Sequence, residues 1–206
     1  MRPIAVLAGC LVAAAALAGL QARGAALRTF QIDPARSRVV IDVGKAGLLS
    51  FAAGHAHEVE ARTVQGSVLF DPEVPLASVV RMQFDSASLR VTGKGEPAAD
   101  VPKVQEIMLS DRVLDVRRHP SIAFESTAVA RAAADTYTVT GRFTLRGITK
   151  PLSVPVKVQI AGDTLTATGK STLKQSDYGI TPISVAGVVK VKDELAISFS
   201  IVAVAR

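Results

Sequence analysis

The sequence predicts an all-β protein, an antiparallel barrel of about eight strands with one short amphipathic helix. Apolar and polar residues alternate over most of the chain after residue 27, and turn-forming residues separate these runs at short intervals. One segment instead repeats its apolar residues at helical spacing. Short connections make consecutive strands antiparallel neighbours, and closing the sheet removes exposed edges that would invite aggregation. These observations favour a barrel.

Residues 1–26 are predicted to be a secretory signal peptide. Arg2 precedes an apolar run from Ile4 to Leu20, and small residues follow it. The run is rich in alanine and glycine, which favours cleavage over retention as a membrane anchor. Cys10, the single cysteine, interrupts the run instead of ending it, which argues against a lipidation site. We therefore expect one domain over residues 27–206, in the periplasm or secreted.

The strand pattern is clearest between Tyr137 and Leu145, where every second residue is apolar or glycine. The same pattern predicts strands over residues 152–160 and 195–201, and weaker versions predict strands over 39–43, 64–70, 80–84 and 122–130. Turns are expected at Asp33-Pro34, Asp71-Pro72, Gly93–Pro97, Arg146-Gly147, Gly162-Asp163 and Lys192-Asp193.

The segment from Asp100 to Leu114 is the predicted helix. Its apolar residues recur at helical intervals, and they are Val101, Val104, Ile107, Met108, Val113 and Leu114. Pro102 is tolerated in a first helical turn, and Asp100 is expected to cap the helix.

Composition excludes some classes of partner. Of 206 residues, 49% are hydrophobic and only 4% aromatic, so a core can form, but the aromatic platforms of single-strand nucleic-acid binders are lacking. No nucleic-acid partner is expected. The net charge of +6 includes two arginines of the signal segment. The remaining mild excess is compatible with transient contact with a membrane surface, although solubility is its commonest meaning.

The barrel interior is expected to carry mostly Val, Ile, Ala and Gly, with a few phenylalanines. Such a lining leaves room for an elongated apolar cavity, and a packed core is the other outcome that the composition allows. If a ligand is bound, the phenylalanines expected to contact it are Phe70, Phe84, Phe124, Phe143 and Phe199.

The sharpest chemical feature is the Gly-His-Ala-His element at residues 54–57. On a strand, His55 and His57 would face the same side. They could be hydrogen-bonded rim residues, or they could recognise the polar end of a ligand. A third interpretation is a metal site completed by His119, Glu58 or Glu60.

No enzyme is predicted, and no catalytic residue, metal ligand or cofactor is assigned. The nucleophile elbow Gly-x-Ser-x-Gly is missing, and so are phosphate-binding loops and dinucleotide fingerprints.

Five segments resemble, in the same order, markers of the YceI-like proteins. They are residues 30–39, 64–71, 85–89, 114–126 and 137–151. The strand leading into Leu145-Arg-Gly-Ile-Thr-Lys-Pro151 is the most specific of them. The resemblance implies a secreted, lipocalin-like barrel whose interior holds a long apolar molecule. Many members carry Arg-Asp-x-His-Leu where this chain has Gln105-Glu-Ile-Met-Leu109, which leaves the ligand's identity open.

The leading hypothesis is therefore non-enzymatic binding or carriage of a polyisoprenoid, quinone-like or fatty-acyl chain in the bacterial periplasm. His55 and His57 would then contact the head group at the barrel mouth. The alternatives are a metal-binding or enzymatic site on these histidines, or a structural or stress-related barrel with a filled core. A homodimer is compatible with each of them.

Overall fold

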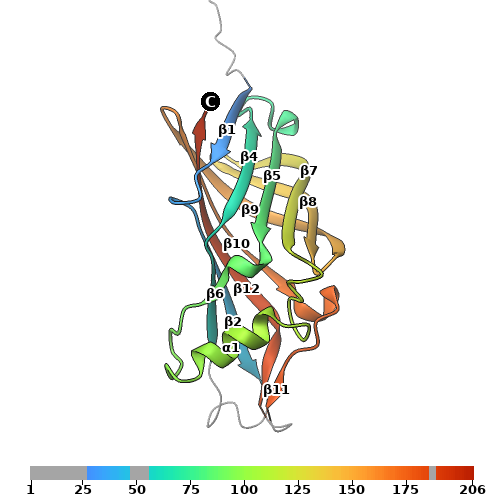
Figure 1. Cartoon of the computed structure of the whole chain (residues 1–206). Coiled ribbons are helices and arrows are strands. Elements are labelled where there is room, and N and C mark those ends of the chain that lie inside the picture. The colour runs from blue at the N-terminus through green and yellow to red at the C-terminus, as the bar shows by residue number, and fades with distance from the viewer. Residues whose placement is uncertain (1–26, 47–55, 186–188) are drawn as a thin grey trace, which may run out of the picture.

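The computed structural model describes residues 27–46, 56–185 and 189–206, which form a closed antiparallel β-barrel (Figure 1). Its strands are β1 (Arg28–Ile32), β2 (Arg38–Ala46), β3 (His57–Ala61), β4 (Val64–Phe70), β5 (Val79–Asp85), β6 (Leu89–Val91), β7 (Ser121–Ala133), β8 (Thr136–Leu145), β9 (Ile148–Ala161), β10 (Thr164–Lys174), β11 (Ser184–Val185) and β12 (Val189–Ala205). One α-helix, α1 (Val101–Leu109), lies in these ranges, and short 3₁₀ turns occupy residues 75–77, 86–88 and 175–178. The predicted all-β barrel is confirmed.

The eight strands of the ring follow the order β1-β4-β5-β7-β8-β9-β10-β12, and β12 pairs back onto β1. A second path leaves β12 through β2 and β3 to β6. β12 is long enough, at 17 residues, to serve both paths. Residues Ala203–Ala205 pair with β1, and the stretch from Lys190 to Ser200 pairs with β2.

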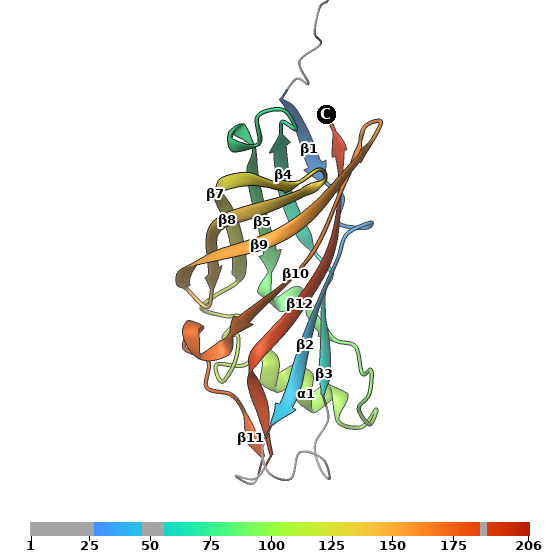
Figure 2. The same cartoon turned by 180° about the vertical axis from the view of Figure 1, so that it is seen from behind.

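The two ends of the barrel differ in how they are covered (Figures 1 and 2). At one end, which carries the C-terminus, β1 joins β4 to β12 and completes the ring. We call this the closed end. At the other end the second path stops at β6, and α1 and β11 lie there. We call this the helix end.

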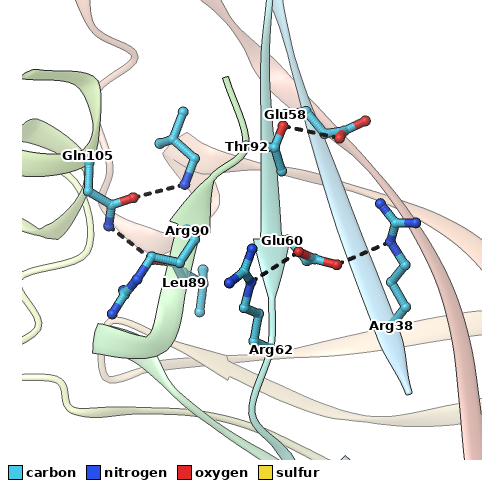
Figure 3. Close-up of polar contacts among 9 residues, drawn as sticks. Arg38, Glu58, Glu60, Arg62, Leu89, Arg90, Thr92 and Gln105 are labelled. Carbon is cyan, nitrogen blue, oxygen red and sulfur yellow. Dashed lines mark hydrogen bonds and ion pairs between the residues drawn. The ribbon is translucent and has the colours of Figure 1, made fainter. Parts of the chain in front are cut away.

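A glutamine on α1 forms hydrogen bonds with backbone groups at the outer edge of β6 (Figure 3). The amide Nε2 of Gln105 donates to the Leu89 carbonyl at 3.0 Å, and its Oε1 accepts from the Val91 N–H at 2.8 Å. The opposite edge of β6 pairs with β3. The side chain of Gln105 thus makes the hydrogen bonds that a neighbouring strand would make.

Successive side chains of each strand point alternately into the barrel and out of it. On β8, Tyr137, Val139 and Leu145 are buried, as their shared face predicts. Outward-facing neighbours form cross-strand ion pairs instead. Glu125 on β7 lies 2.7 Å from Arg142 on β8 and 3.2 Å from Arg81 on β5. Hydrogen bonds from these guanidinium groups lower the pKa of the Glu125 carboxyl below its usual value.

The hairpin between β8 and β9 turns at Arg146-Gly147, as expected. Both residues have positive φ, +51° and +74°, as type I′ hairpin turns require. Arg146 donates from Nη1 to the Gly179 carbonyl at 2.9 Å and from Nη2 to the Asp111 carbonyl at 2.8 Å. This turn therefore fastens the hairpin to the segments that follow α1 and β10.

Three local expectations were wrong. The helix ends at Leu109 and not at Leu114, because Ser110 is extended and closes the last turn through its own backbone N–H. Asp100 has helical backbone angles and makes no capping hydrogen bond with its side chain. Lys192-Asp193 is an irregularity within β12, where the register against β2 shifts, and not a turn between strands.

The predicted signal peptide and His55 lie outside the described residues. Within those residues, no helix is long and apolar enough to cross a bilayer.

Candidate ligand-binding cavity

An elongated cavity of about 630 Å³ occupies the barrel. Its lining on β12 runs from Val191, at the helix end, to Ile201, close to the closed end. These two residues are ten positions apart, which corresponds to roughly 33 Å along the strand. The cavity therefore follows most of the length of the barrel.

The walls of the cavity are aliphatic and aromatic. All five phenylalanines singled out in the sequence line it, namely Phe70, Phe84, Phe124, Phe143 and Phe199. They come from β4, β5, β7, β8 and β12, so they surround the interior. Their contact with a ligand stays a prediction.

Two of these rings lie over glycines of the adjacent strands. A Cβ atom added to Gly169 would come within 2.5 Å of the Phe199 ring, and one added to Gly141 within 2.6 Å of the Phe124 ring. Each ring therefore occupies the space that a side chain on the neighbouring strand would fill. This arrangement sets the rings against the wall and helps to leave the lumen open.

Charged side chains in the cavity lining gather at the helix end. Among the described residues they are Lys45 at the end of β2, His57 at the start of β3, and Asp100 and Lys103 at the start of α1. The cavity is thus apolar along its length and carries two lysines, a histidine and an aspartate at one end. That distribution suits a molecule with a long apolar tail and a polar head.

His57 is held by a buried carboxylate. Its Nδ1 lies 3.0 Å from Oε2 of Glu96, whose side chain is completely buried, whereas the His57 side chain keeps 20% of its exposure. Because a carboxylate accepts, we assign the Nδ1 proton to this bond, which leaves Nε2 of the ring for another partner. The second oxygen of Glu96 has no hydrogen-bond partner within the described part of the chain.

The donors proposed to complete a metal site do not meet at His57. Glu58 pairs with Lys94 at 2.7 Å, Glu60 pairs with Arg38 at 3.2 Å, and the His119 ring lies against Gly147 in the β8–β9 turn. Over residues 27–46, 56–185 and 189–206, no group of three or more His, Cys, Asp or Glu residues is placed to hold a metal ion. His55 is outside these ranges.

A sequence model of the YceI-like domain matches residues 30–203. The chain belongs to the YceI-like family. Curated relatives include a UPF0312 protein of Azotobacter vinelandii, 31% identical over 125 residues, which are 58% of this chain and 61% of the relative. A UPF0312 protein of Pseudomonas aeruginosa is 32% identical over 121 residues, 56% of this chain and 59% of the relative. The matched region of this YceI-like chain thus spans about three fifths of the length of these relatives.

Solved structures support the same YceI-like fold. BcnA of Burkholderia cenocepacia is 25% identical and superposes with a TM-score of 0.68, covering 84% of this chain and 99% of BcnA. A polyisoprenoid binding domain from Saccharophagus degradans has a TM-score of 0.63 and covers 88% of this chain and 100% of that domain. Its identity is only 11%, so this second likeness shows the fold alone.

Sequence reasoning missed two polar residues that build the helix end of this YceI-like barrel. Glu96 stands in a loop predicted only as a turn, and no local pattern pairs it with His57 across 39 positions. Gln105 offered one signal, because it stands where the family's usual Arg-Asp-x-His-Leu begins with Arg. The structure gives Gln105 a backbone-binding role at the β6 edge.

Proposed function

We propose that this protein binds and carries a long apolar molecule, such as a polyisoprenoid, quinone-like or fatty-acyl chain, without transforming it. The observation that carries the proposal is the cavity, which follows the barrel and whose charged lining residues, among those the structure describes, lie at one end. The fold that the chain shares with a polyisoprenoid binding domain is consistent with this class of ligand.

Energetics favour an occupied cavity. Water inside a cavity of about 630 Å³ keeps its apolar walls hydrated, which costs free energy. An apolar ligand removes this cost and contributes about 0.8 kcal/mol for each buried methylene group, before its ordering entropy is subtracted. Affinity would therefore come from the tail.

The head group would lie at the helix end. There the Nε2 atom of His57 is left for a ligand because Glu96 holds Nδ1, and Lys45 and Lys103 line the same end of the cavity. An oxygen-containing head group could accept hydrogen bonds from the lysines and interact with the imidazole. These contacts would orient the ligand and contribute less than the tail.

The proposed setting is the periplasm or the extracellular space. The support is the amino-terminal pattern of Arg2 followed by an apolar run and small residues. Amino-terminal sequencing of the exported protein tests this, and a retained Met1 would contradict it.

Native mass spectrometry of the protein isolated from a bacterial periplasm, combined with lipid analysis of an organic extract, tests the function. We expect a mass above that of the polypeptide, which falls to the polypeptide mass after extraction, together with a long-chain lipid in the extract. A protein that carries no adduct and takes up no prenol or fatty acid when these are added would overturn the proposal. An extract that contains only metal would favour the alternative based on the histidines.

A further inference from the structure

The closed end of the barrel holds an aromatic pair that separates two cavities. Phe70 on β4 and Tyr137 on β8 are both buried, and their ring centroids lie 5.2 Å apart with the planes at 87°. Both residues line the main cavity, and both also line a second pocket of about 500 Å³. Val158 on β9 also lines both spaces, so the two rings together with Val158 form a floor with the main cavity on one side and the second pocket on the other.

The second pocket opens at the outside of the closed end. Its other lining residues include Arg28, Pro72, Asp135 and Ile160, of which Ile160 is 40% exposed. They come from the start of β1, the loop after β4, the β7–β8 turn and the end of β9. Figure 1 shows these segments at the end of the barrel that carries the C-terminus. Removing the floor would thus extend the main cavity toward that end.

One arginine contacts the aromatic pair from the outer side of the barrel. The Arg131 guanidinium lies over the Tyr137 ring, 5.4 Å from its centroid. It also donates to the carbonyl of Ala134 at 3.0 Å and to the carbonyl of Pro72, which is two residues after Phe70. Arg131 therefore connects the loop behind one ring with the hairpin that carries the other.

We propose that Phe70 and Tyr137 set the maximum length of the apolar chain that the barrel accepts, with Arg131 as a positioning residue for the pair. This inference rests on the proposed function. If each methylene-sized group needs about the 30 Å³ of a liquid water molecule, 630 Å³ holds roughly 20 of them. A chain longer than that, with its head at His57, would meet the two rings.

The test measures the affinity for isoprenoid alcohols of increasing length, by competition with a fluorescent fatty acid. Farnesol, geranylgeraniol and progressively longer prenols make the series. For the unmodified protein we expect binding to tighten by about tenfold or more per isoprene unit until the tail reaches the floor, and then to stop improving or to weaken. We call the prenol length at which affinity stops improving the break. In Phe70→Ala the break should move to longer prenols, because the second pocket becomes accessible.

Three further variants keep the test decisive. Phe84→Ala removes a ring that lines only the main cavity, so it should weaken all prenols without moving the break. Tyr137→Phe keeps both rings, and its break should stay in place. Arg131→Ala changes an exposed side chain and should fold even if Phe70→Ala does not. Because Arg131 acts through the rings, its loss should shift the break toward longer prenols, whereas a purely structural role would change only the melting temperature.

The outcomes separate the two proposals. A clear break in the unmodified protein that stays in place in Phe70→Ala and Arg131→Ala would overturn the floor and leave the binding function intact. If neither Phe70→Ala nor its replacement Phe70→Leu folds, the position of the break in Arg131→Ala decides. Failure of the unmodified protein to bind any prenol or the fatty-acid probe would overturn both the floor and the proposed function.

Discussion

The two ends of this barrel are closed by different means. At the closed end, backbone pairing runs without interruption from β4 through β1 to β12, and Phe70 and Tyr137 fill the interior. At the helix end the strand path stops at β6, where two hydrogen bonds from one glutamine replace a ladder. A continuous ladder must break many hydrogen bonds to open, whereas a helix held by a side chain can move as a unit. Under the proposed function, the ligand would therefore enter and leave through the helix end.

Charge follows the same division. The charged residues of the cavity lining, including His57 and both lysines, are at the helix end, while the floor at the closed end is aromatic. Arginines at the closed end lie outside the cavity, with Arg28 over Phe30 and Arg131 over Tyr137. One end thus favours a polar head and the other an apolar tail, so under the proposed function the ligand would bind in one direction.

The largest expected effect is a loss of stability when a buried side chain at the closed end is shortened to alanine. Phe30 is fully buried on β1, so Phe30→Ala should lower the free energy of unfolding by about 3–5 kcal/mol. Ile107 on α1 lines the open cavity and is half-buried, so Ile107→Ala should cost only about 1 kcal/mol. Urea denaturation of both variants measures the difference. Equal losses would contradict the contrast between the ends.

The next effect concerns the glutamine at the β6 edge. Gln105→Met keeps the length of the side chain but leaves the Val91 N–H without a protein partner and the Leu89 carbonyl with Arg90 as its side-chain donor, at a cost of about 1–3 kcal/mol. Amide hydrogen exchange should show faster exchange at Val91, and release of a bound fatty acid should accelerate. Glu106→Met, at an exposed position on the same helix, is the matched control. Unchanged protection of Val91 would refute the edge role of Gln105.

A smaller effect is expected on binding of the head group. His57→Gln should weaken a prenol or fatty acid by about 1 kcal/mol, because one polar contact is lost while the tail contacts remain. Binding of squalene, a hydrocarbon without a head group, should not change. Calorimetric titration measures both ligands. Tight zinc or copper binding that disappears in the variant, with lipid binding unaffected, would instead support a metal site.

The smallest expected effect is on the stability of the fold at acidic pH. One ion pair from each end of the barrel is compared. Hydrogen bonds from Lys94 lower the pKa of Glu58 at the helix end, and hydrogen bonds from Lys157 lower the pKa of Asp135 at the closed end. A carboxyl group with a lowered pKa in the folded state stabilises the fold fully above its usual pKa, 4.5 for Glu and 3.8 for Asp. This contribution is lost as the pH falls through the lowered pKa.

Melting temperatures measured from neutral pH down to about pH 3 test this prediction. Both pairs are solvent-exposed, so Glu58→Gln and Asp135→Asn should each remove only a small part of the acid-induced decrease. An identical pH profile in the variants and the unmodified protein would show that neither pair contributes.

Most of the fold could be predicted because inward and outward residues alternate strongly. Three strands that lack a clear alternation, β3, β6 and β10, were not predicted. β10 places Ala167, Gly169 and Ser171 on its inner face, and these small residues give no hydrophobic period. The short strands β3 and β6 contain too few residues to show a period at all.

The residues of the candidate site also fall into two groups, those that the sequence could place and those that it could not. Phe143 and Phe199 line the cavity, where their strand faces predicted them, since period two decides a side chain's direction locally. Glu96, Gln105 and Arg131 could not be assigned because their roles depend on partners that the fold brings close. The pairing of Arg131 with the loop at Pro72, for example, spans 59 residues.

The pairing of β1 with residues 203–205 has a consequence for how the protein folds. β1 is the first of the described strands to be synthesised, yet its partner on β12 is made about 170 residues later. Contacts of such long sequence separation form slowly, because the loop-closure entropy is lost before the contact forms. The meander from β7 to β10 can pair locally during synthesis, but the ring must wait for β12. A chain whose ring closes last stays open through most of its translation, as the proposed export before folding would require.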